Sequence, residues 1–195
     1  SQKVGENTNN YYFCSKLTVM YVEKEFKLNT SNKNKLAEYR SFGLNCDTTS
    51  FDVEEPLSDE LTIIRYKATK AGERIIVEDS TFFVEGTNIG VDIRFQIGNL
   101  KHHIGKRAKF TIMLGYLLNN KVYVFESHVF GTICTPVREG WDIDPYFKPD
   151  GSEFTRAEYK PNETNPRYIC FHNLLNNNPT SIEEPLYTWS GEFQK

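Results

Sequence analysis

The chain has 195 residues, 38% of them hydrophobic and 25% charged, which is the balance of a globular domain long enough to bury a core. Its formal net charge is −3, whereas nucleic-acid binders carry a basic excess, so the sequence predicts no DNA or RNA partner. No apolar stretch approaches the roughly 20 residues of a membrane span, so no membrane partner is predicted.

Cysteine usage bears on the redox compartment. The cysteines are scattered along the chain without the close spacing of a metal site, at Cys14, Cys46, Cys134 and Cys170. This scatter indicates reduced thiols in a cytosolic or nuclear protein, with two disulfides in a secreted protein as the alternative. Because no signal peptide is visible, we predict a cytoplasmic location.

The N-terminal part of the chain predicts two strands and a helix. Residues 11–22 are aromatic and β-branched, which indicates a strand, and residues 26–30 predict a second short strand. A polar turn then leads to residues 35–40, where a helix is expected to begin. A strand that enters a helix through such a turn offers backbone N–H groups to a phosphate.

The clearest helix lies between residues 57 and 72. Apolar residues recur at helical spacing on one face, namely Leu57, Leu61, Ile64, Ala68 and Ala71. Ser58 is a good N-cap, and Gly72 ends the pattern. In the next run, residues 74–79, three apolar residues follow Arg74 and lead to Glu78 and Asp79, which predicts a buried strand whose C-terminal end delivers both acids to a crevice.

The C-terminal half adds a hairpin and a final helix. Residues 108–118 and 122–132 are β-rich, and the two asparagines between them tolerate the left-handed backbone of a tight turn. Residues 141–147 predict a compact loop or strand, and residues 167–175 predict a helix. The tail at residues 180–195 has no strong pattern. Together the elements predict a single α/β domain with a mixed sheet.

Three segments carry residues suited to chemistry, and the first is the polar turn at residues 30–35. Thr30, Asn32 and Lys35 supply hydroxyl, amide and ammonium donors where a helix N-terminus is expected, which suits a triphosphate. The alternative is an ordinary polar helix cap with solvated lysines, since the run lacks the glycine spacing of a P-loop.

The second segment is the acidic strand end. Adjacent Glu78 and Asp79 are costly to leave unpaired, and Mg²⁺ prefers carboxylate oxygens while it bridges substrate phosphates. Glu54 and Glu55, which follow a strand expected at residues 51–53, are further candidate ligands. The alternative is that these acids occupy solvated turns.

The third segment is the aromatic run at residues 140–151. An exposed indole at Trp141 would stack on a purine, an interaction worth roughly 1–3 kcal/mol per base. The alternative is a loop whose Trp141 and Phe147 fill the core.

In order and spacing, these segments resemble the Ham1/ITPase family of house-cleaning pyrophosphatases from about residue 26 to residue 175. The family's Thr-Gly-Asn-x-x-Lys turn, its Glu before a helical Lys and its Glu/Asp-Asp-Ser/Thr strand end are matched by Thr30, Ser31, Asn32 and Lys35, by Glu55 with Arg65 or Lys67, and by Glu78, Asp79 and Ser80. A Gly-x-Pro-Gly turn is weakly kept around Gly86 and Gly90. The Phe-Gly-Tyr/Trp-Asp-Pro motif and its continuation are matched by Trp141, Asp142, Ile143, Asp144, Pro145, Phe147, Pro149, Asp150, Gly151, Thr155, Ala157 and Glu158.

The resemblance implies an elongated α/β fold, a mixed sheet with flanking helices and two lobes around a nucleotide cleft, usually as a homodimer. It implies Mg²⁺-dependent cleavage, with Mn²⁺ as an alternative metal, between the α- and β-phosphates of a nucleoside triphosphate. The catalytic domain would span residues 26–178, between an N-terminal extension with an extra strand at 1–25 and a C-terminal tail at 179–195.

Carried over by position, the resemblance assigns roles to individual residues. Asp79, Glu78 and Lys35 would be catalytic, and Glu55 with Asp79 would hold the metal. The substrate-binding residues would be Thr30, Asn32, Lys35, Arg65, Ser80, Trp141, Asp144, Lys160, Asn165 and Arg167. Trp141 would stack on the base in place of the family's Phe, and Lys160 would replace its phosphate-binding Lys.

The departures from the family concern recognition of the base. Its Ser-His-Arg triplet aligns with Asn165, Pro166 and Arg167, so only the Arg is retained. Asn165 either caps the helix or offers an amide donor and acceptor suited to an adenine edge. Asp142 stands where the family has Gly, beside the base pocket. We therefore predict hydrolysis of ITP, dITP or XTP, with altered base specificity or a catalytically weak nucleotide-binding module as alternatives.

Overall fold

The computed structural model describes residues 21–87 and 97–195 of the chain. Within them a seven-stranded sheet has the order β2-β1-β3-β4-β5-β6, and β7 pairs with β5. The strands are β1 (Lys27–Asn29), β2 (Asp47–Thr49), β3 (Ile75–Val84), β4 (Arg107–Leu118), β5 (Lys121–Ile133), β6 (Phe147–Pro149) and β7 (Ser181–Glu183). β1 runs parallel to β2 and β3, whereas the other pairs are antiparallel, so the mixed α/β sheet is confirmed.

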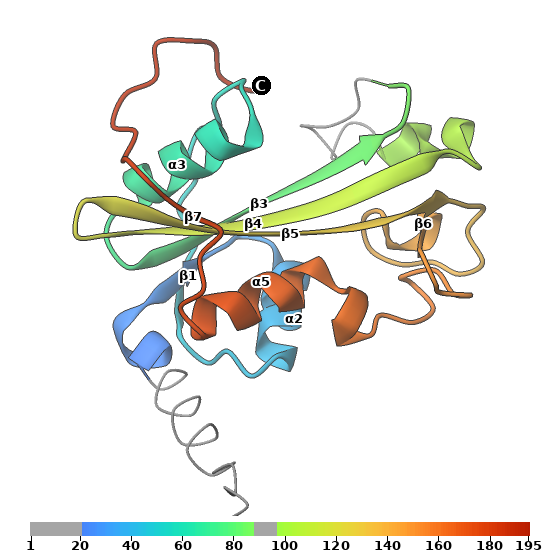
Figure 1. Ribbon diagram of the computed structural model, residues 1–195, viewed down its shortest axis with the longest axis horizontal. Coiled ribbons are helices and arrows are strands. Elements are labelled where there is room, and N and C mark those ends of the chain that lie inside the picture. The colour runs from blue at the N-terminus through green and yellow to red at the C-terminus, as the bar shows by residue number, and fades with distance from the viewer. Residues whose placement is uncertain (1–20, 88–96) are drawn as a thin grey trace, which may run out of the picture.

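Helices cover this sheet on both faces. α3 (Glu60–Ala71) packs on one face, and α2 (Lys33–Ser41) and α5 (Pro166–Leu175) pack on the other (Figure 1). The larger core cluster includes Tyr39 of α2 and Phe171 of α5, whereas the smaller cluster surrounds Ile64 of α3. Short 3-10 helices, η1 (Ile97–His103), η2 (Asp144–Tyr146) and η3 (Asn162–Thr164), complete the loops.

The β4-β5 hairpin runs along the long axis of the sheet, and β6 pairs with β5 at the end opposite the hairpin turn (Figure 1). The two strands contain 12 and 13 residues. Asn119 and Asn120 connect them with φ angles of 51° and 58°, the left-handed backbone that a two-residue hairpin turn needs. The predicted hairpin is confirmed.

The helix ends follow the capping signals of the sequence, with one shift. Asn32 caps α2, Asn165 caps α5 ahead of Pro166, and Gly72 ends α3 with a φ of 94°. The prediction that Ser58 caps α3 is wrong by one residue. Asp59 is the cap because its carboxylate accepts the backbone N–H of Thr62.

Three strand predictions are corrected by long-range pairing. The strand expected at residues 51–53 lies instead at β2, whose polar edge residues give little hydrophobic signal. The tail at residues 180–195 contains β7, which pairs with the edge of β5. β3 continues past Asp79 to Val84 because β4 pairs with it over that whole stretch, so the two acids lie within the strand rather than at its end.

Successive side chains of β3 face opposite sides of the sheet, as in any strand. Ile76 and Phe82 belong to the larger core cluster beneath α2 and α5, whereas Val77 belongs to the cluster beneath α3. Glu78 therefore points toward α2 and α5, and Asp79 points toward α3.

Some predictions fall partly or wholly outside the residues that the structure describes. Residues 11–20 of the expected N-terminal strand and Gly90 lie outside, and Tyr21 with Val22 is helical.

Cys46, Cys134 and Cys170 are free thiols. Within residues 21–87 and 97–195, no helix is both long and apolar enough to span a bilayer.

Close packing of β5 on β6 gives a test of the fold. A Cβ at Gly131 would lie 2.3 Å from the Lys148 carbonyl oxygen and 2.5 Å from the Phe147 ring, whereas one at Gly115 would meet the Ile64 side chain at 2.9 Å. We expect Gly131→Ala to lower the free energy of unfolding by about 3 kcal/mol, and Gly115→Ala by about 1 kcal/mol because a side chain shifts more easily than backbone. Urea denaturation measures both, and equal losses would contradict the β5-β6 contact.

Candidate active site

A cavity of about 440 Å³ opens beside β3, just past the carboxyl end of β1. The pairing of β1 with β3 ends at Leu28 and Ile76, and the next residues of β3 face the cavity. Open α/β sheets bind ligands at this position, outside the carboxyl ends of parallel strands. The lining residues are Asn29, Thr30, Ser31, Asn32, Lys35, Phe51, Asp52, Val53, Glu55, Lys67, Val77, Glu78, Asp79, Ser80, Trp141 and Asp142.

The turn between β1 and α2 uses its polar side chains to hold its own backbone. Asn32 Oδ1 accepts the N–H groups of Asn34 at 3.0 Å and Lys35 at 3.1 Å. The Thr30 hydroxyl accepts the N–H of Asn32 at 3.1 Å. Thr30 and Asn32 line the cavity as predicted, but in this arrangement they act as caps, and the Lys35 side chain supplies the charge.

Glu78 is the centre of a buried ionic network. Arg167 donates to it twice, from Nε at 2.9 Å and from Nη2 at 2.8 Å, and Lys35 Nζ lies 3.2 Å from Oε1 and 3.4 Å from the Ser80 hydroxyl. The Tyr39 hydroxyl also donates to this carboxylate. Burial by itself would raise the pKa of Glu78, but Arg167 and Lys35 outweigh it and hold the pKa well below its usual range. These contacts occupy the carboxylate and do not support the catalytic role predicted for Glu78.

Asp79 is the neighbouring acid, but it faces the α3 side in a different environment. Asp79 is 8% exposed, and within the described part of the chain its carboxylate accepts no hydrogen bond. Burial raises the pKa of Asp79 to about 7, with Lys67 opposing the rise and Glu55 adding to it. A cavity carboxylate that titrates near neutral pH suits a general base or a metal ligand.

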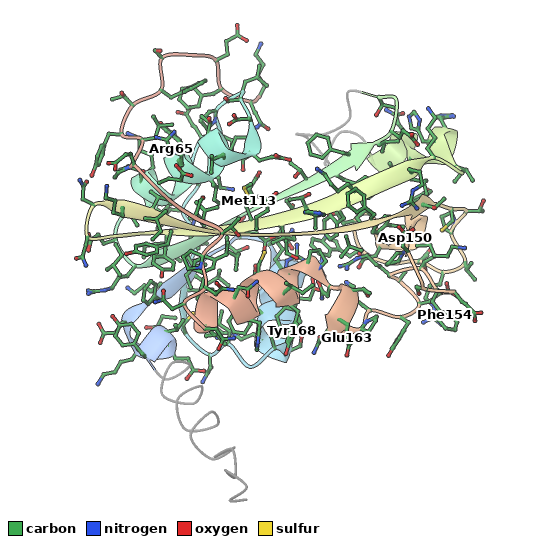
Figure 2. The ribbon with its side chains drawn as sticks, in the orientation of Figure 1. Arg65, Met113, Asp150, Phe154, Glu163 and Tyr168 are labelled. Atoms are coloured by element: carbon green, nitrogen blue, oxygen red, sulfur yellow. The ribbon has the colours of Figure 1, made fainter. Side chains whose placement is uncertain are left out.

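Lys67, rather than Arg65, is the basic residue that α3 brings to the cavity. Its Nζ lies 2.9 Å from Glu55 Oε1 and 2.7 Å from the carbonyl oxygen of Glu78. Arg65 instead donates from Nε to the Glu184 carbonyl at 3.0 Å, beside the C-terminal tail (Figure 2). Arg65 is therefore not among the residues that line the cavity, because residues two apart on a helix point about 200° apart.

Trp141 and Asp142 form another wall of the cavity. The indole ring of Trp141 lies 5.6 Å from the guanidinium carbon of Arg167. Asp142 has a φ of 59°, the left-handed conformation that glycine adopts most easily, and burial raises the pKa of its carboxyl. The indole therefore lies at the cavity, and next to it Asp142 stands where the resemblance predicts a glycine.

Asp144 and Lys160 are paired with each other behind this wall. Lys160 Nζ contacts Asp144 Oδ2, and it lies 3.8 Å from Glu38. Arg156 donates from Nε to Asp144 Oδ1 at 2.9 Å, and its guanidinium carbon lies 4.9 Å from the centre of the Phe110 ring. Asp144 is buried, and neither it nor Lys160 belongs to the cavity lining.

Asn165 and Arg167 are committed to neighbouring side chains. Asn165 Oδ1 accepts the Arg167 N–H at 3.1 Å, and its Nδ2 donates to Glu38 Oε1 at 2.8 Å. Arg167 Nη1 donates to Glu38 Oε2 at 2.5 Å. The residues are 2% and 1% exposed and do not line the cavity. Asn165 thus acts as the helix cap, which was one of its two predicted roles.

The charges of the cavity decide whether a divalent metal fits. Its lining has five carboxylates and two lysines, namely Asp52, Glu55, Glu78, Asp79 and Asp142 against Lys35 and Lys67. Among the described residues no group of three or more His, Cys, Asp or Glu side chains is arranged to hold a metal. Mg²⁺ often binds through one or two carboxylates, with water and substrate phosphates as its other ligands. Glu55 and Asp79 are the two lining carboxylates beside Lys67 that could hold such a metal.

Three residues of the site were missed at the sequence level. Glu38 follows Lys35 by three positions, so helical spacing placed it on the same face and was an available signal. Tyr39 and Arg156 had no local signal, because their carboxylate partners are 39 and 12 residues away in the chain.

Comparison with known proteins identifies the family. The model of the Ham1 family matches residues 27–175, and the chain belongs to this family. It is 31% identical over 145 residues to the dITP/XTP pyrophosphatase of Methanopyrus kandleri, and the match covers 65% of this chain and 76% of that protein. It is 30% identical over 149 residues to the dITP/XTP pyrophosphatase of Korarchaeum cryptofilum, and the match covers 66% of this chain and 81% of that protein.

Solved structures support the same fold. The Ham1 protein of Staphylococcus aureus superposes with a TM-score of 0.64 at 18% identity, covering 78% of this chain and 96% of that one. The HAM1 protein of Coxiella burnetii superposes with a TM-score of 0.65 at 19% identity, with the same coverage. The sheet and flanking helices are therefore those of Ham1 proteins.

Replacing Glu78 by Gln should destabilise the fold. The change keeps the size of the side chain but removes the charge that balances buried Arg167, and we expect a loss of about 3 kcal/mol in the free energy of unfolding. Tyr39→Phe is the matched control, because it removes only one hydrogen bond to the same carboxylate, worth about 1 kcal/mol. Urea denaturation at pH 7.5 compares the two, and equal stability would contradict the ionic network.

Replacing Asp79 by Asn should have the opposite effect at neutral pH. Since the native pKa of Asp79 is about 7, against 3.8 ordinarily, its protonated form stabilises the native state, and this stability is lost as the pH rises through about 7. The variant should match the wild type near pH 4 and exceed it above pH 7, by up to roughly 4 kcal/mol. Melting curves from pH 4 to 8 with a chelator present measure this, and parallel curves would refute it.

Proposed function

We propose that this chain is a nucleoside triphosphate pyrophosphatase. It hydrolyses triphosphates of non-standard purines, such as ITP, dITP and XTP, to the monophosphate and pyrophosphate in the presence of Mg²⁺. The observation that carries the proposal is Asp79, a buried cavity carboxylate whose pKa is about 7 and which lies near the Lys67–Glu55 ion pair. Membership of the Ham1 family and the names of the curated relatives support the substrate class.

Two lysines on opposite sides of β3 supply the positive charge for a triphosphate. Lys35 approaches from the α2 side, where Glu78 and Ser80 hold its ammonium group, and Lys67 approaches from the α3 side. Because carboxylates outnumber these lysines around the cavity, a triphosphate without accompanying cations would be repelled. This imbalance supports a divalent metal as part of the substrate complex.

Glu55 and Asp79 are the residues that would hold the metal, which when bound neutralises phosphate charge and lowers the pKa of water. Asp79 accepts the proton of the attacking water as the water oxygen bonds to the α-phosphorus. The bond between the α-phosphorus and the bridging oxygen breaks, and pyrophosphate leaves with its electrons. Lys67 stabilises the leaving charge, and the buried Glu78 network keeps Lys35 in place.

The base is proposed to stack on Trp141, whose ring is at the cavity wall. Arg167 supports this wall from behind through its contact with the indole, and Glu38 fixes both Asn165 and Arg167. Asp142 adds a carboxyl group where the family has none, and the base preference depends on what it accepts. A homodimer, Mn²⁺ as a substitute metal and a cytoplasmic location stay predictions.

The activity test is a panel of nucleoside triphosphates with Mg²⁺, including ITP, dITP, XTP and the standard nucleotides, with pyrophosphate and orthophosphate quantified separately. We expect pyrophosphate from at least one non-standard purine nucleotide. Asp79→Asn should lose at least about 100-fold in kcat, as expected for a lost general base, while it remains folded. Arg65→Gln is the matched control and should keep wild-type kcat, because Arg65 faces the tail.

The outcomes separate the alternatives. Pyrophosphate from a standard nucleotide alone would show that the pocket around Asp142 has changed its base preference. Tight nucleotide binding with no product from any nucleotide would refute the enzymatic proposal and favour a nucleotide-binding module. Full activity in Asp79→Asn would refute the role of that residue.

A further inference from the structure

The loop that carries Glu55 is held by the C-terminal tail. Residues 53–55 lie outside the helices and strands, yet the Glu55 carboxylate lines the cavity and pairs with Lys67. The Glu55 carbonyl accepts the Gln194 N–H at 2.8 Å, and the Leu57 N–H donates to the Glu192 carbonyl at 2.8 Å. Gln194 Nε2 donates to the Pro56 carbonyl at 3.2 Å. Within the described chain, the backbone hydrogen bonds of Glu55, Pro56 and Leu57 all go to the tail.

The tail is anchored before it reaches this loop. β7 pairs with β5, and the tail then crosses α3, where the Leu186 N–H donates to the Thr69 hydroxyl at 2.9 Å. Phe193 packs on α3 with its ring 5.7 Å from that of Tyr66, and it forms an antiparallel bridge with Pro56. Figure 1 shows the tail running from the sheet past α3 to its end.

A turn around Gly191 sets the direction of the last residues. The Trp189 indole donates from Nε1 to the Glu192 carbonyl at 2.9 Å and covers Gly191. A Cβ at Gly191 would lie 2.7 Å from the indole ring, so the ring can close this turn only over glycine. The tail therefore approaches the Glu55 loop with a defined geometry, and it lies beyond residues 27–175, which the family model matches.

We propose that residues 192–194 are positioning residues for the metal site, because they hold the loop at 55–57 so that the Glu55 carboxylate stays beside Lys67 in the cavity. This inference rests on the proposed function for the role of Glu55, but it concerns this chain's own tail. Residues that orient a metal ligand through hydrogen bonds typically change metal affinity by roughly 10- to 100-fold when they are altered.

We call the contacts of residues 192–194 with residues 55–57 the clamp, and it matters because little else fixes Glu55. Its ion pair with Lys67 is partly exposed, with side-chain exposures of 14% for Lys67 and 23% for Glu55, and a partly exposed pair by itself fixes a loop only weakly. Without the tail, the loop would gain backbone freedom, and each metal-binding event would have to order it again. The cost would appear as weaker metal binding rather than as a change in nucleotide contacts.

The test uses the full chain with two clamp variants and one control. Gln194→Pro removes the N–H that bonds the Glu55 carbonyl and the amide that bonds Pro56, and Phe193→Ala removes the contact with Tyr66. Tyr187→Phe is the control, because it breaks the tail's hydrogen bond to Asn120 at 2.6 Å without touching the loop. Two readouts are hydrogen exchange of the peptide that contains Leu57 and titration with Mn²⁺ alone followed by electron paramagnetic resonance.

We expect the Leu57 N–H to exchange faster in both clamp variants, and both variants to bind Mn²⁺ roughly 10-fold more weakly, with the control unchanged in both readouts. In the pyrophosphatase assay, they should need correspondingly more Mg²⁺ for half-maximal rate, while KM for the nucleotide at saturating Mg²⁺ stays within about two-fold.

Unchanged exchange in both variants would overturn the clamp, and faster exchange with unchanged Mn²⁺ binding would overturn its role at the metal site. A wild-type chain that binds no Mn²⁺ would overturn it too. If no nucleotide is hydrolysed but the exchange and Mn²⁺ results are as expected, the proposed function fails and the clamp stands.

Discussion

The paired hydrogen bonds between Arg167 and Glu78 hold together three elements that are distant in the sequence. Arg167 comes from α5 and Glu78 from β3, and Glu38 and Tyr39 of α2 complete the network. Buried charges of this kind are tolerated only when almost every donor and acceptor has a partner, so the relative position of the three elements is narrowly set. Lys35 and Trp141 both contact this network, and the cavity takes its shape from them.

The alternation of side chains along β3 places a carboxylate that is paired inside the fold and a carboxylate that titrates near neutral pH on opposite faces of the sheet. Glu78 and Asp79 are adjacent, yet one has a pKa held well below its usual range and the other a pKa of about 7. Neighbouring residues of a strand point to opposite faces of the sheet. On the face of Glu78, α5 supplies Arg167. On the face of Asp79, α3 supplies Lys67, which is already paired with Glu55. A single strand thus provides an inert anchor and a titrating group within one residue of each other.

Much of the architecture could be predicted from local pattern. The hairpin at Asn119 and Asn120, the caps at Asn32 and Asn165 and the stop at Gly72 follow from backbone preferences that need no partner. β2, β7 and the continuation of β3 could not, because strand pairing between distant segments decides them.

The candidate site shows the same division. Lys35 and Asp79 could be found from motif order, whereas the choice of Lys67 over Arg65 depended on helix register. The contacts that commit Asn165, Arg167 and Glu78 to each other and to Glu38 are tertiary. The different surroundings of Glu78 and Asp79 follow from a simpler rule, because the period of two in any strand places neighbouring side chains on opposite faces of the sheet.

The two tryptophans of the chain lie at different sites, one at the cavity and one in the C-terminal tail. Trp141 forms part of the cavity wall against Arg167, and Trp189 closes the turn that directs the tail to the Glu55 loop. The protein therefore contains two tryptophan fluorophores with distinct surroundings, one next to a guanidinium and one over a glycine. A Trp→Phe change at either position leaves a single tryptophan, so the two variants report separately, by tryptophan emission, on occupancy of the cavity and on docking of the tail.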